Sequence, residues 1–344
     1  LQNVSDINIS LEIFGNQISS PILIAPCAFH KLVCPRGEID TAIAANKIGT
    51  IMTLSTMSNC TIEEVANASN ALKWFQLYVF KNHDITKYMV KRAEKSGYTA
   101  LVVTVDVPAM GMRLRDIRNQ FKLPSNIDAA NFRDVNLSSL SEQMNGSKIK
   151  EHTDQQFDAG LTWEAIDWLF TITKLPIILK GILNTEDALE AINHRVSGII
   201  VSNHGGRQMD SVISGLDVLP DIVEILENRI PVFVDGGIRS GEDVLKAIAL
   251  GATAVMIGRP VMWSLAIGGE NHLVSMFQKL EQELILTMRL TGCASLNKIH
   301  EKGLSLLSSQ HLIFRKIQQQ LENNSLFIPV ANEITKPPMN RLFK

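Results

Sequence analysis

Eight short apolar runs, separated by longer stretches with helical spacing, restrict the possible folds of this 344-residue chain more than any other feature. Runs that lack a polar face are typical of parallel strands, which are buried on both sides. Strands alternating with helices predict an α/β protein, and eight repeats favour a single (β/α)8 TIM barrel over a doubly wound sheet. The expected strands are Ile22–Ala25, Ile51–Ser55, Trp74–Val79, Ala100–Asp106, Pro176–Lys180, Gly198–Ser202, Pro231–Asp235 and Ala254–Gly258.

Helices are expected between these strands, because apolar residues recur there every three or four positions. Two of them are preceded by residues that favour the N-cap position, Thr61 and Asn184. Their side-chain oxygens can accept a hydrogen bond from a backbone N–H of the first turn. The expected helices are Glu38–Lys47, Ile62–Ala68, Ile85–Ser96, Thr162–Ile172, Thr185–Asn193, Gly215–Asn228, Gly241–Leu250 and Leu273–Thr291.

Two segments fall outside the alternation. Residues 114–160 are polar and rich in Asn, Ser and Asp, and they are predicted to form a mobile, lid-like insertion after the fourth strand. Residues 302–344 contain a helical stretch (Ile313–Leu321) and Pro337-Pro338, and they are predicted to form a C-terminal helix and linker. The barrel domain is therefore expected to cover residues 1–301.

Composition argues against several classes of protein. The net charge is −2 and no basic block occurs, which argues against binding of nucleic acid. No apolar run approaches the roughly 18 residues that would indicate a membrane span. The four cysteines lack paired metal-ligand spacing and are expected to be reduced thiols, so an intracellular, cytoplasmic location is predicted. The last residues, Arg341–Lys344, match no peroxisomal address signal.

The stretch Ser202–Asp210 follows an apolar strand and is the strongest functional signal. It places a possible base, His204, and a possible carboxylate-binding cation, Arg207, on either side of two glycines. Glycines let a flat cofactor and a small substrate approach the backbone closely. A lone histidine in a tight turn is more often structural, but polar groups also end the other strands. Because the carboxyl ends of barrel strands meet on one face, a ligand site is expected there.

The last two strands predict a phosphate site. Asp235-Gly236-Gly237-Ile238-Arg239 and Gly258-Arg259 follow strands seven and eight, where barrels commonly bind phosphate. Glycines expose backbone N–H groups, and the two arginines add charge-assisted hydrogen bonds.

The remaining polar strand ends suit an isoalloxazine ring and a small acid. Ser55, Gln76 and Thr104 could hydrogen-bond its pyrimidine edge, and Lys180 could offset negative charge on its N1/O2 side. Structural alternatives are a snorkelling Lys180, a solvated Arg113 and a core aromatic at Tyr78.

These motifs, in this order, resemble the FMN-dependent L-2-hydroxy-acid oxidase and dehydrogenase family, which includes glycolate oxidase, lactate oxidase and mandelate dehydrogenase. The resemblance runs from about residue 15 to about residue 300. The matching segments are Pro21–Ala28, Gly49–Ser55, Trp74–Val79, Leu101–Asp106, Leu175–Gly181, Ser202–Asp210, Pro231–Arg239 and Leu250–Pro260.

The resemblance implies oxidation of a 2-hydroxy acid to a 2-oxo acid, by hydride transfer to flavin N5 and proton transfer to His204. Asp106 would be the partner of this base, and Lys180 would assist the flavin. Tyr78, Arg113 and Arg207 are similar to substrate-binding residues. The implied FMN site comprises Cys27, Ala28, Ser55, Gln76, Thr104, Lys180, Ser202, Asp235, Gly236, Gly237, Arg239, Gly258 and Arg259.

Three departures from the family are visible. An amino-terminal helical segment that carries a second substrate-binding tyrosine has no match here. Its loss is expected to weaken carboxylate binding roughly ten- to a hundredfold, since a hydrogen bond to a charged group is worth about 1.5–3 kcal/mol. Met57 stands where the family often has tryptophan, and residues beyond about 302 match no family segment. The chain starts at Leu1, which suggests an excerpt of a larger polypeptide.

Several alternatives stay open. A domain of a multidomain enzyme could act on a carrier-bound hydroxyacyl group, another FMN barrel could catalyse isomerisation, and a non-catalytic FMN barrel could serve as an interaction module. The electron acceptor could be oxygen, a quinone or a cytochrome. The resemblance also implies a homotetramer.

Overall fold

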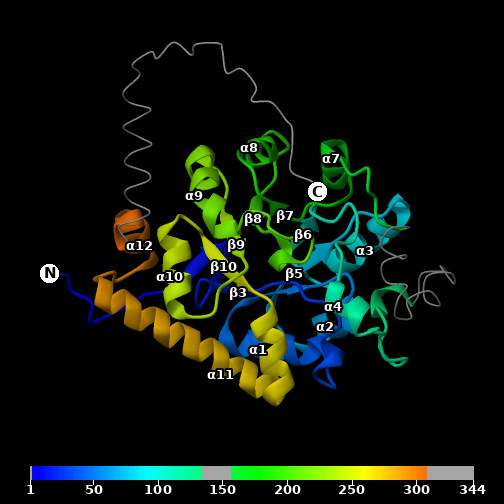
Figure 1. Ribbon diagram of the computed structural model, residues 1–344, viewed down its shortest axis with the longest axis horizontal. Coiled ribbons are helices and arrows are strands. Elements are labelled where there is room, and N and C mark those ends of the chain that lie inside the picture. Colours follow the sequence, from blue (N-terminus) through cyan, green and yellow to red (C-terminus); the bar gives the residue numbers. More distant parts are fainter. Residues whose placement is uncertain (1, 134–155, 308–344) are drawn as a thin grey trace, which may run out of the picture. The chain divides into compact units, whose positions relative to one another are not determined.

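A closed barrel of eight parallel strands forms the centre of the protein (Figure 1). The computed structural model describes residues 2–133 and 156–307. The strand order around the barrel is β10-β3-β4-β5-β6-β7-β8-β9, so neighbours in sequence are neighbours in space. This confirms the (β/α)8 prediction. The strands are β3 (Ile22–Ile24), β4 (Ile51–Leu54), β5 (Leu72–Leu77), β6 (Ala100–Thr104), β7 (Ile177–Ile182), β8 (Gly198–Val201), β9 (Val232–Asp235) and β10 (Ala254–Ile257).

Helices surround the barrel, as the apolar spacing predicts (Figure 1). The expected N-caps are confirmed, since the Thr61 side chain accepts from Glu64 N–H and the Asn184 side chain accepts from Asp187 N–H. The helices between or after strands are α1 (Glu38–Ile48), α2 (Ile62–Ala68), α3 (His83–Lys95), α7 (Trp163–Ile172), α8 (Thr185–Asn193), α9 (Gly215–Leu226), α10 (Gly241–Ala249) and α11 (Arg259–Thr291).

The last of these helices begins earlier than the sequence predicted. α11 starts at Arg259, directly after β10, rather than at Leu273. The backbone leaves helical geometry at Gly268 and Gly269, which divides α11 into two parts. The break interrupts the helical periodicity, so the sequence pattern predicts only the second part of the helix. It also places Arg259 in the first turn of a helix, where backbone N–H groups point outward.

A hairpin closes the amino-terminal end of the barrel. Its strands, β1 (Leu11–Ile13) and β2 (Asn16–Ile18), pair antiparallel, and Ile13 and Ile18 are buried with the side chains of the barrel interior. Phe14 contacts Trp74 with ring centroids 5.9 Å apart. The cavity described below lies at the opposite end of the barrel, where the strands have their carboxyl ends.

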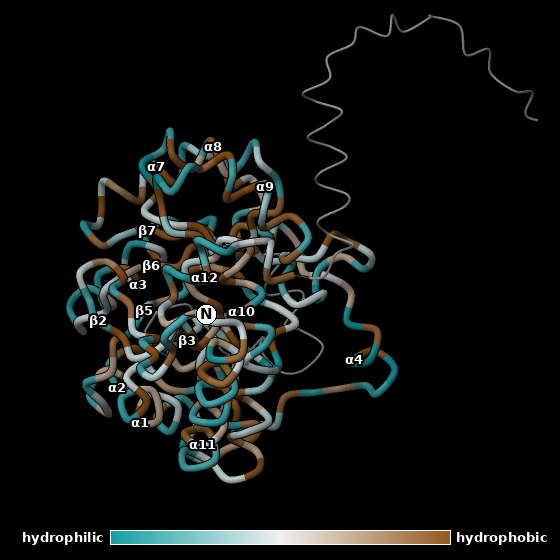
Figure 2. The backbone as a smooth tube through the Cα atoms, turned by 90° about the vertical axis from the view of Figure 1, so that its left-hand side faces the viewer, coloured by the Kyte–Doolittle hydropathy of each residue, from teal (hydrophilic) through white to brown (hydrophobic). Residues whose placement is uncertain are grey.

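The long excursion after β6 is partly described. It contains α4 (Leu114–Arg118) and a short 3-10 helix, η2 (Ala130–Phe132), while residues 134–155 lie outside the described residues. Figure 2 shows α4 set off from the body of the barrel. Leu114 and Ile117 expose most of their apolar surface there. The lid-like role of residues 114–160 stays a prediction.

At its carboxyl end the described chain continues through α12 (Leu296–Lys302) and the 3-10 helix η4 (Gly303–Leu306). Residues 1–306 form one compact unit. The helix expected at 313–321 lies outside the described residues, so the domain boundary at residue 302 also stays a prediction. Among the described helices, none combines the length and apolarity needed to cross a bilayer.

Candidate active site

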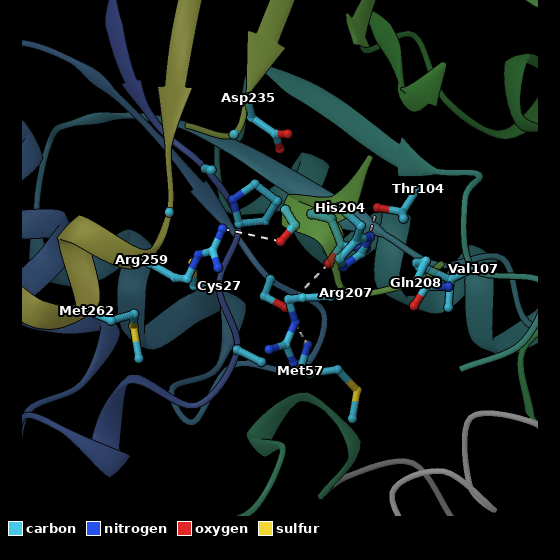
Figure 3. Close-up of a pocket in the computed structure, with 18 of the residues that line it drawn as sticks. Cys27, Met57, Thr104, Val107, His204, Arg207, Gln208, Asp235, Arg259 and Met262 are labelled. Carbon is cyan, nitrogen blue, oxygen red and sulfur yellow. Dashed lines mark hydrogen bonds between the residues drawn. The ribbon is translucent and has the colours of Figure 1, made fainter. Parts of the chain in front are cut away.

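A cavity of about 470 Å³ opens at the carboxyl ends of the barrel strands. All but two of the site residues predicted from the sequence line it, and these two, Asp106 and Ser202, lie directly behind His204. In Figure 3, Asp235 lies at the top of the view, Met57 and Arg207 lie below, and His204 lies between them. The predicted residues in the cavity wall are Cys27, Ala28, Ser55, Gln76, Tyr78, Thr104, Arg113, Lys180, His204, Arg207, Asp235, Gly236, Gly237, Arg239, Gly258 and Arg259.

His204 is held by a carboxylate from a neighbouring strand. It opens the 3-10 turn η3 (His204–Gly206) directly after β8, and its Nδ1 lies 2.9 Å from Asp106 Oδ1. An ionised carboxylate only accepts hydrogen bonds, so when the His204 ring is neutral this contact places its proton on Nδ1 and leaves Nε2 as the basic atom. The backbone N–H of His204 also donates to Ser202 Oγ.

Asp106 reaches His204 only because glycine occupies position 181. Gly181 has a φ of +113°, and a Cβ there would lie 2.5 Å from Asp106 Cβ. Such a contact is far below van der Waals distance. This requirement was not predicted, because Gly181 follows the expected strand Pro176–Lys180, whereas in the structure it lies inside β7.

Two arginines face the same cavity. The guanidinium of Arg113 donates to the carbonyl oxygen of Gly111 and to Gln208 Oε1, and its buried Nε has no hydrogen-bond partner within the described residues. Burial, and then the charge of Arg207, lower the pKa of Arg113. Neither arginine forms an ion pair within residues 2–133 and 156–307. A carboxylate bound between these two cations would therefore offset their repulsion.

Tyr78 contributes a protonated hydroxyl to the cavity. Its ring stacks on Phe157 with centroids 4.3 Å apart. Burial and the nearby Asp106 raise its pKa well above the usual value, so the phenol stays a hydrogen-bond donor at neutral pH.

Lys180 is a buried cation in the cavity wall. Its Nζ lies 2.9 Å from Asp235 Oδ2 and 2.7 Å from Ser202 Oγ, and its side chain is 5% exposed. Burial alone lowers the pKa of this lysine, but attraction to Asp235 and Asp106 outweighs burial, and the pKa is raised. The snorkelling alternative is therefore wrong, because the ammonium is enclosed rather than solvated.

A chain of side-chain hydrogen bonds links three neighbouring strand ends. Gln76 Nε2 donates to Thr104 Oγ1 at 3.0 Å, and Gln76 Oε1 accepts from Ser55 Oγ and from the backbone N–H of Thr56. The chain fixes the orientation of the Gln76 amide. The part of the cavity wall formed by the ends of β4, β5 and β6 thus offers donors and acceptors with settled directions.

The loop after β9 and the start of α11 form a region of open backbone. Gly236 and Gly237 have φ values of +93° and +80°, and a Cβ at Gly237 would meet nothing within 4 Å. Arg259 donates to the carbonyl oxygen of Gly205 at 3.2 Å, and the Arg239 guanidinium lies over the Trp263 ring. Glycine backbone that a ligand can approach closely, beside two cations, suits a phosphate.

Cys27 lines the cavity beside Gly258, at the end of β10. Burial, and then the charge of Asp235, raise the pKa of its thiol to about 11, so the thiol is protonated at neutral pH. A Cβ at Gly258 would lie 3.3 Å from Cys27 Sγ, so glycine leaves room for the sulfur.

This donor set fits flavin mononucleotide. Asp235 Oδ1 and Arg113 Nε are buried without hydrogen-bond partners among the described residues, and both belong to residues that line the cavity. The glycine backbone with Arg239 and Arg259, the buried ammonium of Lys180 and the ordered amide of Gln76 line the same cavity. The fold and the site define an FMN-binding barrel oxidoreductase.

Comparison with known proteins agrees with this class. Residues 1–306 match the family model described as FMN-dependent dehydrogenase, and the chain belongs to this family. It is 47% identical over 299 residues to the peroxisomal (S)-2-hydroxyacid oxidase GLO4 of Arabidopsis thaliana, covering 87% of this chain and 81% of the relative. It is 44% identical over 302 residues to human 2-hydroxyacid oxidase 1, with coverage of 87% and 82%.

A solved structure of mandelate oxidase superposes with a TM-score of 0.81 at 42% identity, covering 87% of this chain and 83% of that one. The predicted family, barrel fold, enzyme class and FMN dependence are thus confirmed.

Some lining residues were not predicted from the sequence. Several of them come from the excursion after β6, which has no periodicity to assign its side chains to a face. Gln208 adjoins Arg207 in the predicted motif, so its position was a usable signal. Met57, which stands where the family often has tryptophan, also lines the cavity. The additional residues include Met110, Asp116, Phe121, Leu123, Phe157 and Gln208.

Proposed function

We propose that this protein oxidises an L-2-hydroxy acid to the corresponding 2-oxo acid with FMN, and that His204 is the base. One observation carries this proposal. The Asp106-bound imidazole of His204 and the guanidinium groups of Arg113 and Arg207 line one cavity. A 2-hydroxy acid carries a hydroxyl on the carbon next to its carboxylate, so this arrangement matches both of its polar groups.

The arginines bind the carboxylate and fix the hydroxyl against the imidazole. Nε2 of His204 takes the hydroxyl proton, and Asp106 stabilises the imidazolium that forms. Tyr78 donates a hydrogen bond to the substrate oxygen. When bound, FMN supplies the acceptor, at flavin N5, for the hydride that leaves the hydroxyl-bearing carbon. Lys180 places positive charge on the flavin side of the cavity.

The substrate side chain meets an apolar part of the cavity wall. Met57, Met110, Phe121 and Leu123 line it. Methionine adapts to varied apolar shapes better than a rigid aromatic ring. Acids with an apolar side chain are therefore included beside glycolate and lactate in the test below.

The test is anaerobic mixing of the FMN-loaded protein with L-2-hydroxy acids of increasing side-chain size. The expected result is loss of flavin absorbance with one or more acids and formation of the 2-oxo acid in equal amount. If no acid bleaches the flavin, the proposal is wrong. A hydroxyacyl thioester belongs in the panel, because its turnover would instead support a carrier-bound substrate.

We also propose oxygen as the electron acceptor, which the oxidase names of the relatives support. Readmission of air should restore the flavin absorbance and release hydrogen peroxide. Restoration only by a quinone or a cytochrome would contradict this. The homotetramer and the cytoplasmic location stay predictions.

A further inference from the structure

The side-chain amide of Gln208 joins the two loops that carry the acid-binding and proton-accepting groups. Its Nε2 donates to the carbonyl oxygens of Asp106 at 2.8 Å and Ala109 at 2.9 Å. Its Oε1 accepts from the backbone N–H of Gly111 at 3.1 Å and from Arg113 Nη2 at 3.3 Å. A primary amide has two N–H donors and two acceptor sites, so these four bonds use its full capacity.

The two loops meet backbone to backbone at this point. A Cβ at Gly111 would lie 2.4 Å from the carbonyl oxygen of Gln208 and 2.5 Å from that of Arg207. Only glycine permits so close an approach. The loop after β6 and the loop after β8 are therefore in direct backbone contact at Gly111. The hydrogen bonds of the Gln208 amide fix the position of one loop relative to the other.

The groups proposed to bind the substrate carboxylate and to accept the hydroxyl proton come from these two loops. Asp106 and Arg113 come from the loop after β6, whereas His204 and Arg207 come from the loop after β8. The Gln208 amide bonds directly to the backbone of Asp106 and to the side chain of Arg113. Figure 3 shows Gln208 at the edge of the cavity, on the same side as Thr104 and Val107.

We propose that Gln208 is a positioning residue that sets Arg113 and the Asp106–His204 pair in one geometry toward the substrate. This inference rests on the proposed function above. Gln208 suits the task because its Oε1 is a neutral acceptor. It orients the guanidinium of Arg113 and leaves its positive charge for the substrate carboxylate. A carboxylate in the same place would pair with Arg113 and compete with the substrate.

The first test compares Gln208→Met and Gln208→Glu with the wild type. Gln208→Met keeps the volume and removes all four hydrogen bonds. We expect the KM for the acid, and the Kd for oxalate measured from the flavin spectrum, to rise about tenfold, the size of one charge-assisted hydrogen bond. Gln208→Glu should raise both at least as much, because its charge opposes the substrate anion. FMN content should stay at the wild-type level in both variants.

The matched control is Gln17→Met. Gln17 lies in the hairpin at the other end of the barrel, where its amide bonds only to the exposed Glu12 among the described contacts. KM, kcat and oxalate affinity should be unchanged in this variant.

The second test is a double-mutant cycle with Arg113→Met. If Gln208 acts through Arg113, Gln208→Met should change oxalate affinity less than twofold once Arg113 is absent. A full tenfold effect in that background would overturn the proposal, as would unchanged oxalate affinity in both Gln208 variants. If Gln208→Met does not fold, Gln208→Ala provides the same cycle, because it also removes all four hydrogen bonds and adds no charge. Failure of the wild type to oxidise any acid would refute the proposed function alone, since oxalate titration does not require turnover.

Discussion

Replacement of Asp106 by asparagine should slow flavin reduction without removing the flavin. The variant keeps the shape of the side chain and an oxygen that can accept from His204 Nδ1, but it removes the negative charge. Asp106 lies behind His204 and outside the cavity wall, so FMN content should not change. The effect should fall on the step in which the imidazole becomes positively charged.

The size of this effect follows from the geometry. Nδ1 and Oδ1 are 2.9 Å apart, which puts the centres of charge about 4 Å apart. Two opposite charges at that distance attract by about 4 kcal/mol at an effective dielectric constant of about 20. The side chains of His204 and Asp106 are 22% and 13% exposed, so solvent weakens this attraction. We therefore expect a loss of roughly 2–4 kcal/mol, or about 30- to 1,000-fold in rate.

Anaerobic stopped-flow measurement of the loss of flavin absorbance with an L-2-hydroxy acid gives this rate. Asp167→Asn is the matched control, because Asp167 Oδ1 lies 3.0 Å from Nδ1 of His194 in a similar pair that does not line the cavity. It should reduce flavin at the wild-type rate. An Asp106→Asn rate within threefold of wild type, in protein loaded with FMN, would refute the assignment of His204 as the base.

Three further predictions concern neighbouring groups. Gly181→Ala should lower kcat/KM by at least about tenfold while FMN stays bound, because the new Cβ displaces Asp106; wild-type kinetics would contradict this. Lys180→Met should lower the free energy of unfolding of the FMN-saturated protein by about 3–5 kcal/mol, because Asp235 is left buried and unpaired. In the same urea titrations, Lys180→Met/Asp235→Asn should lower the free energy of unfolding by less. His194→Gln should destabilise the protein more at pH 5.5 than at pH 8.5. Hydrogen bonding to Asp167 raises the pKa of His194 above 6.5 in the folded state. Its contribution is therefore fully present below 6.5 and is lost as pH rises through the folded pKa. Equal destabilisation at both pH values would show that the charge of His194 contributes nothing to stability.

The barrel and many of the residues that line its cavity could be predicted from the sequence. Strands buried on both faces read as continuous apolar runs, and helices show their own period, so the order of elements follows from local pattern. Once eight strands form a ring, chain direction alone brings Ser55, Gln76, Thr104, Lys180 and Asp235 to the same end. Each of these residues could be assigned to the cavity from its place at the end of a predicted strand alone.

The contacts that position these groups do not follow from local pattern, because they depend on pairs of residues distant in the sequence. The pairing of Asp106 with His204 was expected from the family resemblance. Asp106 and His204 are 98 residues apart, and the approach of Asp106 depends on an absent side chain at Gly181. Gln208 reaches across 102 residues to the Asp106 carbonyl. Local periodicity contains no information on such distances. They are set by the register of the strands and by which backbone segments can touch, and only the closed barrel determines both.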